Sequence, residues 1–246
     1  MGEIISDLSI VYYTSNYLDD TNPYFLKNTQ DQLLKAIGNF PLIIVSQKPT
    51  MFGSNSVNVC VGEIGRSHLN LYKQILQGCQ AAKTKYVAMA EDDILYSWEH
   101  FHSRLPSPNT FLYDMNKVSL FTWTKPPLFS FRTNRKVVNQ LISERNLLIE
   151  ALEERFAKVK KRMDAGETEE HVIQYWGDPG RYENYLGVTV RKCEEFYCTN
   201  PSIVFSHEFA FGYLSRGERK LLGDLRITAL DKWGSAESML KLFYKP

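Results

Sequence analysis

The sequence of 246 residues has only four cysteines, and no two of them form a Cys-x-x-Cys pair. This spacing argues against a zinc knuckle or a dithiol redox motif. Isolated cysteines with apolar neighbours are typical of core thiols in a reducing compartment. No apolar run approaches the roughly 18 residues of a membrane span, and no signal peptide is recognisable. We therefore expect a cytoplasmic protein without a membrane span.

A strong net charge is also missing. The formal net charge is +1, so no global argument points to nucleic acid or to a membrane surface. The charge is nevertheless uneven, because residues 117–162 carry 11 basic and 4 acidic side chains, a net charge of +7 that leaves −6 for the rest. This basic segment could face an anionic partner such as the phosphate backbone of DNA, or it could be an ordinary solvated helix face.

Internal repeats and low-complexity tracts are absent as well, and the first hundred residues instead alternate between strand-like and helix-like patterns. Their order is strand, helix, strand, strand, helix, strand, at residues 8–16, 22–38, 41–49, 56–63, 66–82 and 86–93. This order predicts an α/β fold with a mostly parallel sheet. At 43% hydrophobic residues, the composition is that of an ordinary globular protein.

The second half of the chain has a different pattern. Residues 98–131 are rich in proline, serine and aromatic residues, and 117–123 reads as a strand. Apolar residues then step by threes and fours, which predicts one long helix over about 132–164 that ends at Ala165-Gly166. We expect a single domain over 1–246, with a ligand-binding half at 1–100 and a second half at 101–246.

The stretch "KYVAMAEDDILY" (85–96) places three carboxylates directly after a buried strand, at Glu91, Asp92 and Asp93. Adjacent like charges destabilise one another, and a bound cation commonly offsets this repulsion. The first strand also ends in polar residues, at Thr14, Ser15 and Asn16. If the two strands are neighbours in a parallel sheet, both polar ends converge on one crevice, where ligands bind. Carboxylates there suit ribose hydroxyls and a divalent cation that holds a diphosphate.

"YVAMAEDDILY" resembles the D-x-D motif of GT-A-fold, metal-dependent nucleotide-sugar glycosyltransferases, in an E-D-D variant. The early strand ending in Thr-Ser-Asn, the "GRSHLN" start of the preceding helix and the lead-in "AAKTKYVAMAEDD" support this resemblance. It is good over about 8–96, weak over 196–217 and nearly absent between. It implies a GT-A-like single domain with a Rossmann-like sheet and a long helical insertion after the acidic motif. A compact chain of this kind is similar to enzymes of bacterial or phage cytoplasm.

The resemblance implies a role for each matching residue. Asp93 is expected to bind the metal directly, and Glu91 or Asp92 to contact ribose or a metal-bound water. His207, after a late strand, is expected to complete the metal site, and such a set suits Mn²⁺ rather better than Mg²⁺. The nucleoside and phosphates of the donor are expected to bind at Thr14, Ser15, Asn16 and Arg66.

Each of these assignments has a simpler alternative. The acidic triplet could cap the following segment, and Thr-Ser-Asn is a common loop composition. His207 and Arg66 could be surface residues.

The acceptor side is less defined by the sequence. If the reaction inverts configuration, a carboxylate must deprotonate the acceptor hydroxyl, and the candidates are Asp178, Glu183 and Glu208. Asp178 could equally be a turn residue of "WGDPG", and a retaining reaction needs no such base. The acceptor itself is undefined, and a hydroxymethylated DNA base is one candidate because of the basic segment at 117–162.

Other function classes stay open at the level of sequence. A nucleotidyltransferase that makes sugar nucleotides is one, although "YYTSNYLDDTNP" (12–23) has no glycine or basic residue to form a phosphate loop. A non-catalytic nucleic-acid-binding protein could use the basic helix, but it would have no use for the acidic triplet. A chain that binds a nucleotide sugar without transferring it is the third.

Overall fold

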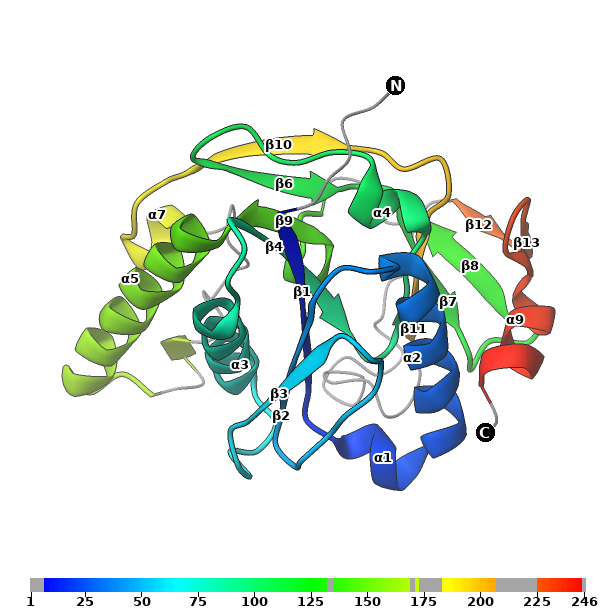
Figure 1. Ribbon diagram of the computed structural model, residues 1–246, viewed down its shortest axis with the longest axis horizontal. Coiled ribbons are helices and arrows are strands. Elements are labelled where there is room, and N and C mark those ends of the chain that lie inside the picture. Colours follow the sequence, from blue (N-terminus) through cyan, green and yellow to red (C-terminus); the bar gives the residue numbers. More distant parts are fainter. Residues whose placement is uncertain (1–6, 132–134, 169–170, 173–182, 207–224, 245–246) are drawn as a thin grey trace.

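The computed structural model describes residues 7–131, 135–168, 171–172, 183–206 and 225–244. Its central element is a seven-stranded sheet built from β1 (Leu8–Thr14), β2 (Leu42–Ser46), β3 (Ser56–Cys60), β4 (Tyr86–Glu91), β6 (Thr110–Asp114), β9 (Leu141–Glu144) and β10 (Lys192–Phe196). Their spatial order is β10-β6-β9-β4-β1-β2-β3 (Figure 1). Only β9 runs antiparallel to its neighbours, so the predicted mixed α/β fold with a largely parallel sheet is confirmed.

Helices cover both faces of this sheet, which explains why its inner strands are apolar along their whole length. Val11 and Tyr13 of β1 face a core shared with α3 (His68–Ala81) and α5 (Arg145–Asp164). Ile10 and Tyr12, on the other face, pack against α2 (Pro23–Ile37) and α4 (Trp98–His102). Gly78 lets α3 approach the sheet closely, because an added Cβ would overlap Val11 and lie 2.9 Å from Val45 Cγ2.

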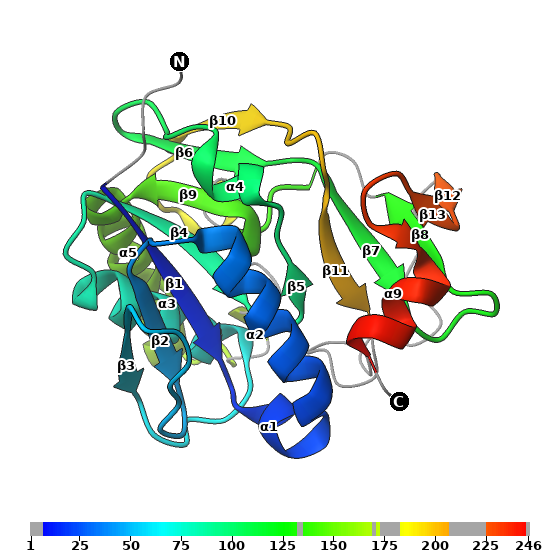
Figure 2. The same cartoon turned by 45° about the vertical axis from the view of Figure 1, so that its right-hand side comes forward.

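A second sheet of five strands continues from the first. It contains β5 (Ile94–Leu95), β7 (Lys117–Phe121), β8 (Leu128–Phe131), β11 (Ser202–Ser206) and β12 (Arg226–Ile227), in the order β12-β8-β7-β11-β5. Its core includes α9 (Ala236–Phe243) and the first turn of α2. Figure 2 shows α2 between the two sheets, where its two ends join two different hydrophobic cores. A hairpin of β13 (Ala229–Leu230) and β14 (Gly234–Ser235) precedes α9.

The helix predicted over about 132–164 is shorter in the structure. Residues 138–140 form the 3₁₀ turn η1 (Val138–Gln140), 141–144 form β9, and α5 begins only at Arg145. The sequence misled because Leu141 is buried in a strand covered on both faces, and such a strand has the same continuous apolar pattern as a buried helix turn. The end of the helix was predicted correctly, since α5 stops at Asp164.

The central sheet takes strands from both predicted halves of the chain, because β9 lies between β4 and β6. Two further helices are short, α1 (Tyr17–Thr21) and α7 (Glu183–Leu186). Among the described residues, no helix has the length and apolarity needed to cross a membrane.

Candidate functional site

The strand order of the central sheet reverses direction next to β1. Following the chain, β2 lies beside β1 and β3 beside β2, whereas β4 lies on the opposite side of β1. Open α/β sheets bind ligands at such a switch point, in the crevice beyond the carboxyl ends of the strands. β1 and β4 are parallel neighbours with Tyr13 opposite Glu91, so the predicted convergence of their polar ends is confirmed.

Thr14 and Asp92 connect the two strand ends directly. The Thr14 hydroxyl donates a hydrogen bond of 2.6 Å to Asp92 Oδ2, and the backbone N–H of Asn16 donates to the same hydroxyl oxygen at 3.0 Å. The Asp92 carbonyl accepts from the Thr29 hydroxyl at 2.9 Å. Burial raises the pKa of Asp92 to about 6, although the Thr14 hydrogen bond and the charge of Arg66 act in the opposite direction. The carboxylate at this position is therefore electrostatically costly and suits a nearby cation.

Glu91 is held in a separate network. Its two carboxylate oxygens accept from the Tyr13 hydroxyl and from Asn139 Nδ2, both at 2.7 Å. The Tyr96 hydroxyl accepts from the Glu91 N–H at 3.2 Å and donates to the Asn139 carbonyl at 3.0 Å. Glu91 thus fixes the end of β4 against η1, a role that the sequence did not indicate.

Asp93 lies where the two sheets meet. β5 follows it at once and pairs antiparallel with β11, and the Phe205 N–H donates to the Asp93 carbonyl at 3.0 Å. β11 ends at Ser206, so the chain leaves this strand beside the acidic motif. His207 is the next residue and lies outside the described residues.

The Asn16 side chain is hydrogen-bonded within the protein and stabilises the loop after β1. It adopts a left-handed backbone conformation with φ 61°. Its Oδ1 accepts from the N–H groups of Gln47 and Lys48 at 2.7 and 2.9 Å, and its Nδ2 donates to Asp19 and Thr50 at 2.8 and 2.7 Å. The Asn16 amide therefore joins the end of β1 to the end of β2. Of the predicted residues Thr14, Ser15 and Asn16, only Ser15 makes no side-chain hydrogen bond within the described structure, and it is half-buried.

Gln47 organises the loop that presents Arg66, and sequence analysis missed it. Its Oε1 accepts from the N–H groups of Ile64 and Gly65 at 3.1 and 3.0 Å, and its Nε2 donates to the Gly65 carbonyl at 2.9 Å. The Arg66 guanidinium then lies 4.0 Å from the ring centre of Tyr17, a cation–π geometry. The sequence feature that could have indicated Gln47 is a polar residue directly after an apolar strand, as in "LIIVSQ".

The three predicted base candidates are placed unequally. Asp178 and Glu208 lie outside the described residues. Glu183 is 7% exposed, and its Oε1 accepts from Arg155 Nη2 at 2.7 Å in the contact between α5 and α7. In Figure 1, α7 lies far from the lower ends of β1 and β4. The Glu183 carboxylate therefore has a structural partner in Arg155.

The basic segment is partly neutralised. In α5, Lys160 pairs with Asp164 at 2.6 Å, and Arg162 pairs with Glu167 at 2.6 Å. Arg155 is fully buried. These contacts reduce the charge available for a phosphate backbone.

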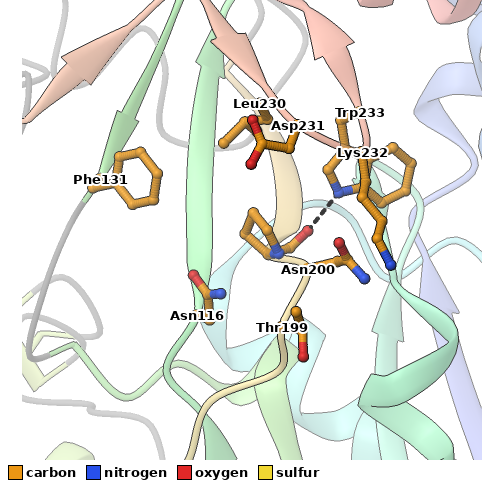
Figure 3. Close-up of a pocket in the computed structure, with 9 residues that line it drawn as sticks. Asn116, Phe131, Thr199, Asn200, Leu230, Asp231, Lys232 and Trp233 are labelled. Carbon is orange, nitrogen blue, oxygen red and sulfur yellow. Dashed lines mark hydrogen bonds between the residues drawn. The ribbon is translucent and has the colours of Figure 1, made fainter.

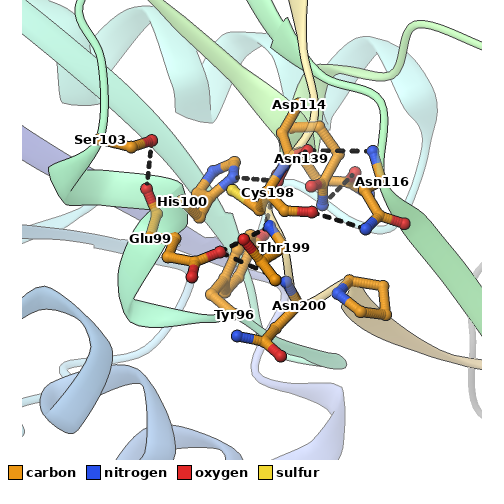
Figure 4. A network of polar contacts seen from close by, with 12 residues as sticks. Tyr96, Glu99, His100, Ser103, Asp114, Asn116, Asn139, Cys198, Thr199 and Asn200 are labelled. Atoms are coloured by element: carbon orange, nitrogen blue, oxygen red, sulfur yellow. Dashed lines mark hydrogen bonds and ion pairs between the residues drawn. The ribbon is translucent and has the colours of Figure 1, made fainter. Parts of the chain in front are cut away.

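A second polar cluster lies between the sheets (Figure 4), and Tyr96, whose hydroxyl accepts from the Glu91 N–H, packs against His100 in it. Within the described part of the chain, only His100, Asp114 and Cys198 form a group of three potential metal ligands, with ligand atoms within 4.8 Å of one another. Asp114 accepts from His100 Nδ1 at 3.1 Å and from the N–H groups of Asn116 and Cys198 at 3.0 and 3.3 Å. Hydrogen bonds thus satisfy this carboxylate, and burial raises the pKa of the Cys198 thiol. The cluster is a possible metal site whose geometry fits a hydrogen-bonded junction equally well.

No protein-family model and no curated protein matches this sequence. Among solved structures, the chain is similar to the bifunctional IspDF from Campylobacter jejuni, at 12% identity and a TM-score of 0.46, over 78% of this chain and 50% of that one. It therefore spans about half the length of that protein. It is also similar to 2-C-methyl-D-erythritol 4-phosphate cytidylyltransferase from Thermus thermophilus, at 9% identity and TM-score 0.47, over 82% and 94%.

A third similar structure is a Drosophila β1,4-galactosyltransferase 7 mutant in complex with manganese, UDP-Gal and xylobiose, at 14% identity and TM-score 0.42, over 89% and 77%. All three TM-scores are below 0.5, so the functional proposal rests on the geometry of the site itself.

Proposed function

We propose that this chain transfers a sugar from a nucleotide-diphosphate donor to an acceptor hydroxyl, as a GT-A-type glycosyltransferase with an E-D-D motif. The observation that carries the proposal is the 2.6 Å hydrogen bond from Thr14 to Asp92, which joins the ends of two parallel strands at the switch point of the sheet. Polar side chains, the half-buried Asp92 carboxylate and Arg66 meet at the edge where open α/β sheets bind nucleotides.

Each described residue then has a specific task. Ser15 and the backbone after β1 contact the nucleoside, and Arg66 contributes positive charge toward the diphosphate. Glu91 and Asn16 act as positioning residues, because their side chains are used in hydrogen bonds within the protein. Asp92 contacts ribose or a metal-bound water.

The donor set at the end of β4 fits a hard divalent cation, Mn²⁺ or Mg²⁺. Asp93 directly follows the half-buried Asp92, so its carboxylate would supply an oxygen ligand, while Asp92 would hold the ribose or a metal-bound water. His207, which follows β11, is the predicted additional ligand, and a nitrogen ligand favours Mn²⁺. When bound, the cation supplies Lewis-acid neutralisation of the leaving diphosphate.

The acceptor side of the proposal is coarser. If configuration inverts, Asp178 or Glu208 is a better candidate than Glu183 for the base, since Glu183 is paired with Arg155. A hydroxymethylated DNA base is kept as one acceptor class. Charge reversal at Lys158 and Lys161 should then weaken DNA binding with strong salt dependence, and unchanged activity on DNA would remove this class.

A nucleotidyltransferase is the main competing function. It must cradle a triphosphate after the first strand, but here the first turn of α1 carries Asp19 and Asp20. Two carboxylates at a helix start repel phosphate. Release of pyrophosphate from a nucleoside triphosphate and a sugar phosphate would support the competing function, whereas release of a nucleoside diphosphate from a sugar nucleotide supports ours.

Thermal unfolding of the purified chain with nucleoside diphosphates and nucleotide sugars, with and without Mn²⁺, tests the donor site. A ligand at about 100 times its Kd should stabilise the protein by roughly 2.7 kcal/mol, a shift of several degrees for a domain of this size. We expect a metal-dependent shift with one nucleobase that Asp93→Ala removes and the exposed control Asp20→Asn retains. No shift with any nucleotide would contradict the proposal.

A further inference from the structure

A cavity of about 210 Å³ lies at the end of the second sheet opposite to the acidic motif (Figure 3). Residues from the starts of β7 and β11, the end of β8 and the β13–β14 hairpin line it. β11 runs from this cavity toward Ser206, beside the acidic motif. At about 3.3 Å per residue, the five residues of β11 separate the two places. The cavity is therefore distinct from the proposed donor site.

The floor of the cavity is held rigidly by backbone contacts. Glu99 Oε2 accepts from the N–H groups of Thr199 and Asn200 at 2.6 and 3.3 Å. Trp233 Nε1 donates to the Pro201 carbonyl at 2.8 Å, which ties the hairpin to the segment before β11. Just below, Asn116 Nδ2 donates to the Cys198 carbonyl at 2.7 Å (Figure 4). A preorganised floor lowers the entropy cost of binding a ligand.

The backbone of this floor is hydrogen-bonded within the protein, whereas most polar side chains around it are not. Four polar side chains line the cavity without a hydrogen bond or ion pair to any other part of the described structure: Thr199, Asn200, Asp231 and Lys232. Two half-buried aromatic rings, Phe131 and Trp233, line it as well and lie on opposite sides of the view in Figure 3.

We infer that this cavity binds one unit of a neutral saccharide. A sugar ring offers apolar C–H faces for the aromatic rings and hydroxyl groups that both donate and accept hydrogen bonds. Asp231 accepts, Lys232 donates, and the Asn200 amide and Thr199 hydroxyl do both. One acidic and one basic side chain give no net charge that would select an ion.

The size of the cavity supports the same class of ligand. Its 210 Å³ is below the roughly 300–1,000 Å³ of pockets for drug-sized ligands, which favours a small ligand over a nucleotide. A cavity of this volume can hold a ligand the size of a single ring.

The simpler explanation is that Asp231 and Lys232 are solvated residues in the turn of a hairpin. The Trp233–Pro201 hydrogen bond fixes the hairpin over the cavity, so the exposed side chains of Asp231 and Lys232 stand at its rim, where water solvates them until a ligand binds. The saccharide site does not depend on the proposed sugar transfer, since it needs neither a nucleotide nor a metal.

Tryptophan fluorescence of the full chain, titrated with glucose, galactose, mannose, cellobiose, lactose and maltose without nucleotide or metal, tests the inference. We expect one of these sugars to bind with a Kd on the order of 1 mM, the weak range typical of a few contacts. Asp231→Ala and Asn200→Ala should each weaken binding by about tenfold. Trp98→Phe, at an exposed ring outside the cavity, is the matched control and should bind as the unmodified protein does.

Three outcomes would overturn the inference. The first is that none of the six sugars binds, and the second is that both cavity variants bind a sugar unchanged. The third is that glycylglycine binds in competition, which would make the ligand a zwitterion. Asp93→Asn separates this inference from the proposed function: it should abolish the metal-dependent nucleotide shift and leave saccharide binding intact.

Discussion

The carboxyl edge of β1 and β4 and the cavity at the far end of the second sheet use polar side chains differently. At the edge, Asn16 makes four hydrogen bonds and Glu91 accepts two, all within the protein. Around the cavity, the side chains of Asn200 and Asp231 make none with the described residues. At the edge, most polar groups hold the backbone in place, whereas the cavity has a fixed backbone and polar side chains that are open to solvent and to a ligand.

The largest effect is expected at Asp93. If the edge is the donor site, Asp93→Ala should lower the transfer rate by about 1,000-fold, about 4 kcal/mol in activation free energy. The substitution keeps the hydrogen bond from the Phe205 N–H, because that bond uses the backbone carbonyl of Asp93, so the pairing of β5 with β11 should survive. Steady-state rates and a thermal melt, with Asp20→Asn as control, check both parts. A rate within threefold of the unmodified protein would place the donor site elsewhere.

Glu183→Leu tests whether the Glu183 carboxylate acts in catalysis or stabilises the folded protein. Removing one partner of a buried ion pair should lower the free energy of unfolding by about 3 kcal/mol, because Arg155 is fully buried. Urea unfolding measures the change. The double variant Arg155→Met/Glu183→Leu should regain most of the stability. If the double variant is stable but has lost transfer activity, Glu183 acts in catalysis after all.

Asn16→Ala and Asn200→Ala compare the two regions directly. Asn16→Ala leaves the buried N–H of Gln47 and the partly buried N–H of Lys48 without their acceptor and puts alanine at positive φ, so we expect a loss of about 2–3 kcal/mol. Asn200→Ala should change stability by less than about 0.5 kcal/mol. Urea denaturation of both variants measures the difference, and equal losses would show that the cavity amide is also structural.

Thr14→Val removes the hydroxyl that joins β1 to Asp92 while keeping the shape of the side chain. It should cost about 1–2 kcal/mol of stability and weaken nucleotide binding, because Asp92 loses its orientation. Thr14→Ser keeps the hydroxyl and serves as the control. Equal behaviour of the two variants in thermal melts with nucleotide would contradict a role for this hydrogen bond.

The smallest effect concerns pH. The pKa of Asp92 is about 6 in the folded protein and about 3.9 in an unfolded chain, so the folded state binds the proton more tightly. The free energy of unfolding should therefore fall as the pH rises from about 4 to about 6, by about 1 kcal/mol after allowance for solvent screening. Denaturation with EDTA present measures this, and Asp92→Asn should flatten the decline. An identical decline in the variant would assign it to another group.

Much of the fold was predictable from sequence because strand and helix periods separate cleanly over residues 8–93. The convergence of Thr14 and Asp92 was predictable for the same reason, since parallel neighbours bring their carboxyl ends together. β9 was not, because a strand buried on both faces has no alternation to distinguish it from helix. The partners of Asn16, Glu91 and Gln47 could not be identified from the sequence, since hydrogen bonds of these side chains reach 31, 48 and 17 or 18 residues along the chain.

The position of β9 also has a consequence for the order of folding. β4 and β6 come first along the chain, yet they do not pair with each other, because β9 lies between them and pairs with both. A nascent chain that ends before residue 141 therefore has two neighbouring strand edges with unpaired backbone groups. The sheet closes only after Leu141–Glu144 has been synthesised, and until then these edges are open to pairing with another chain.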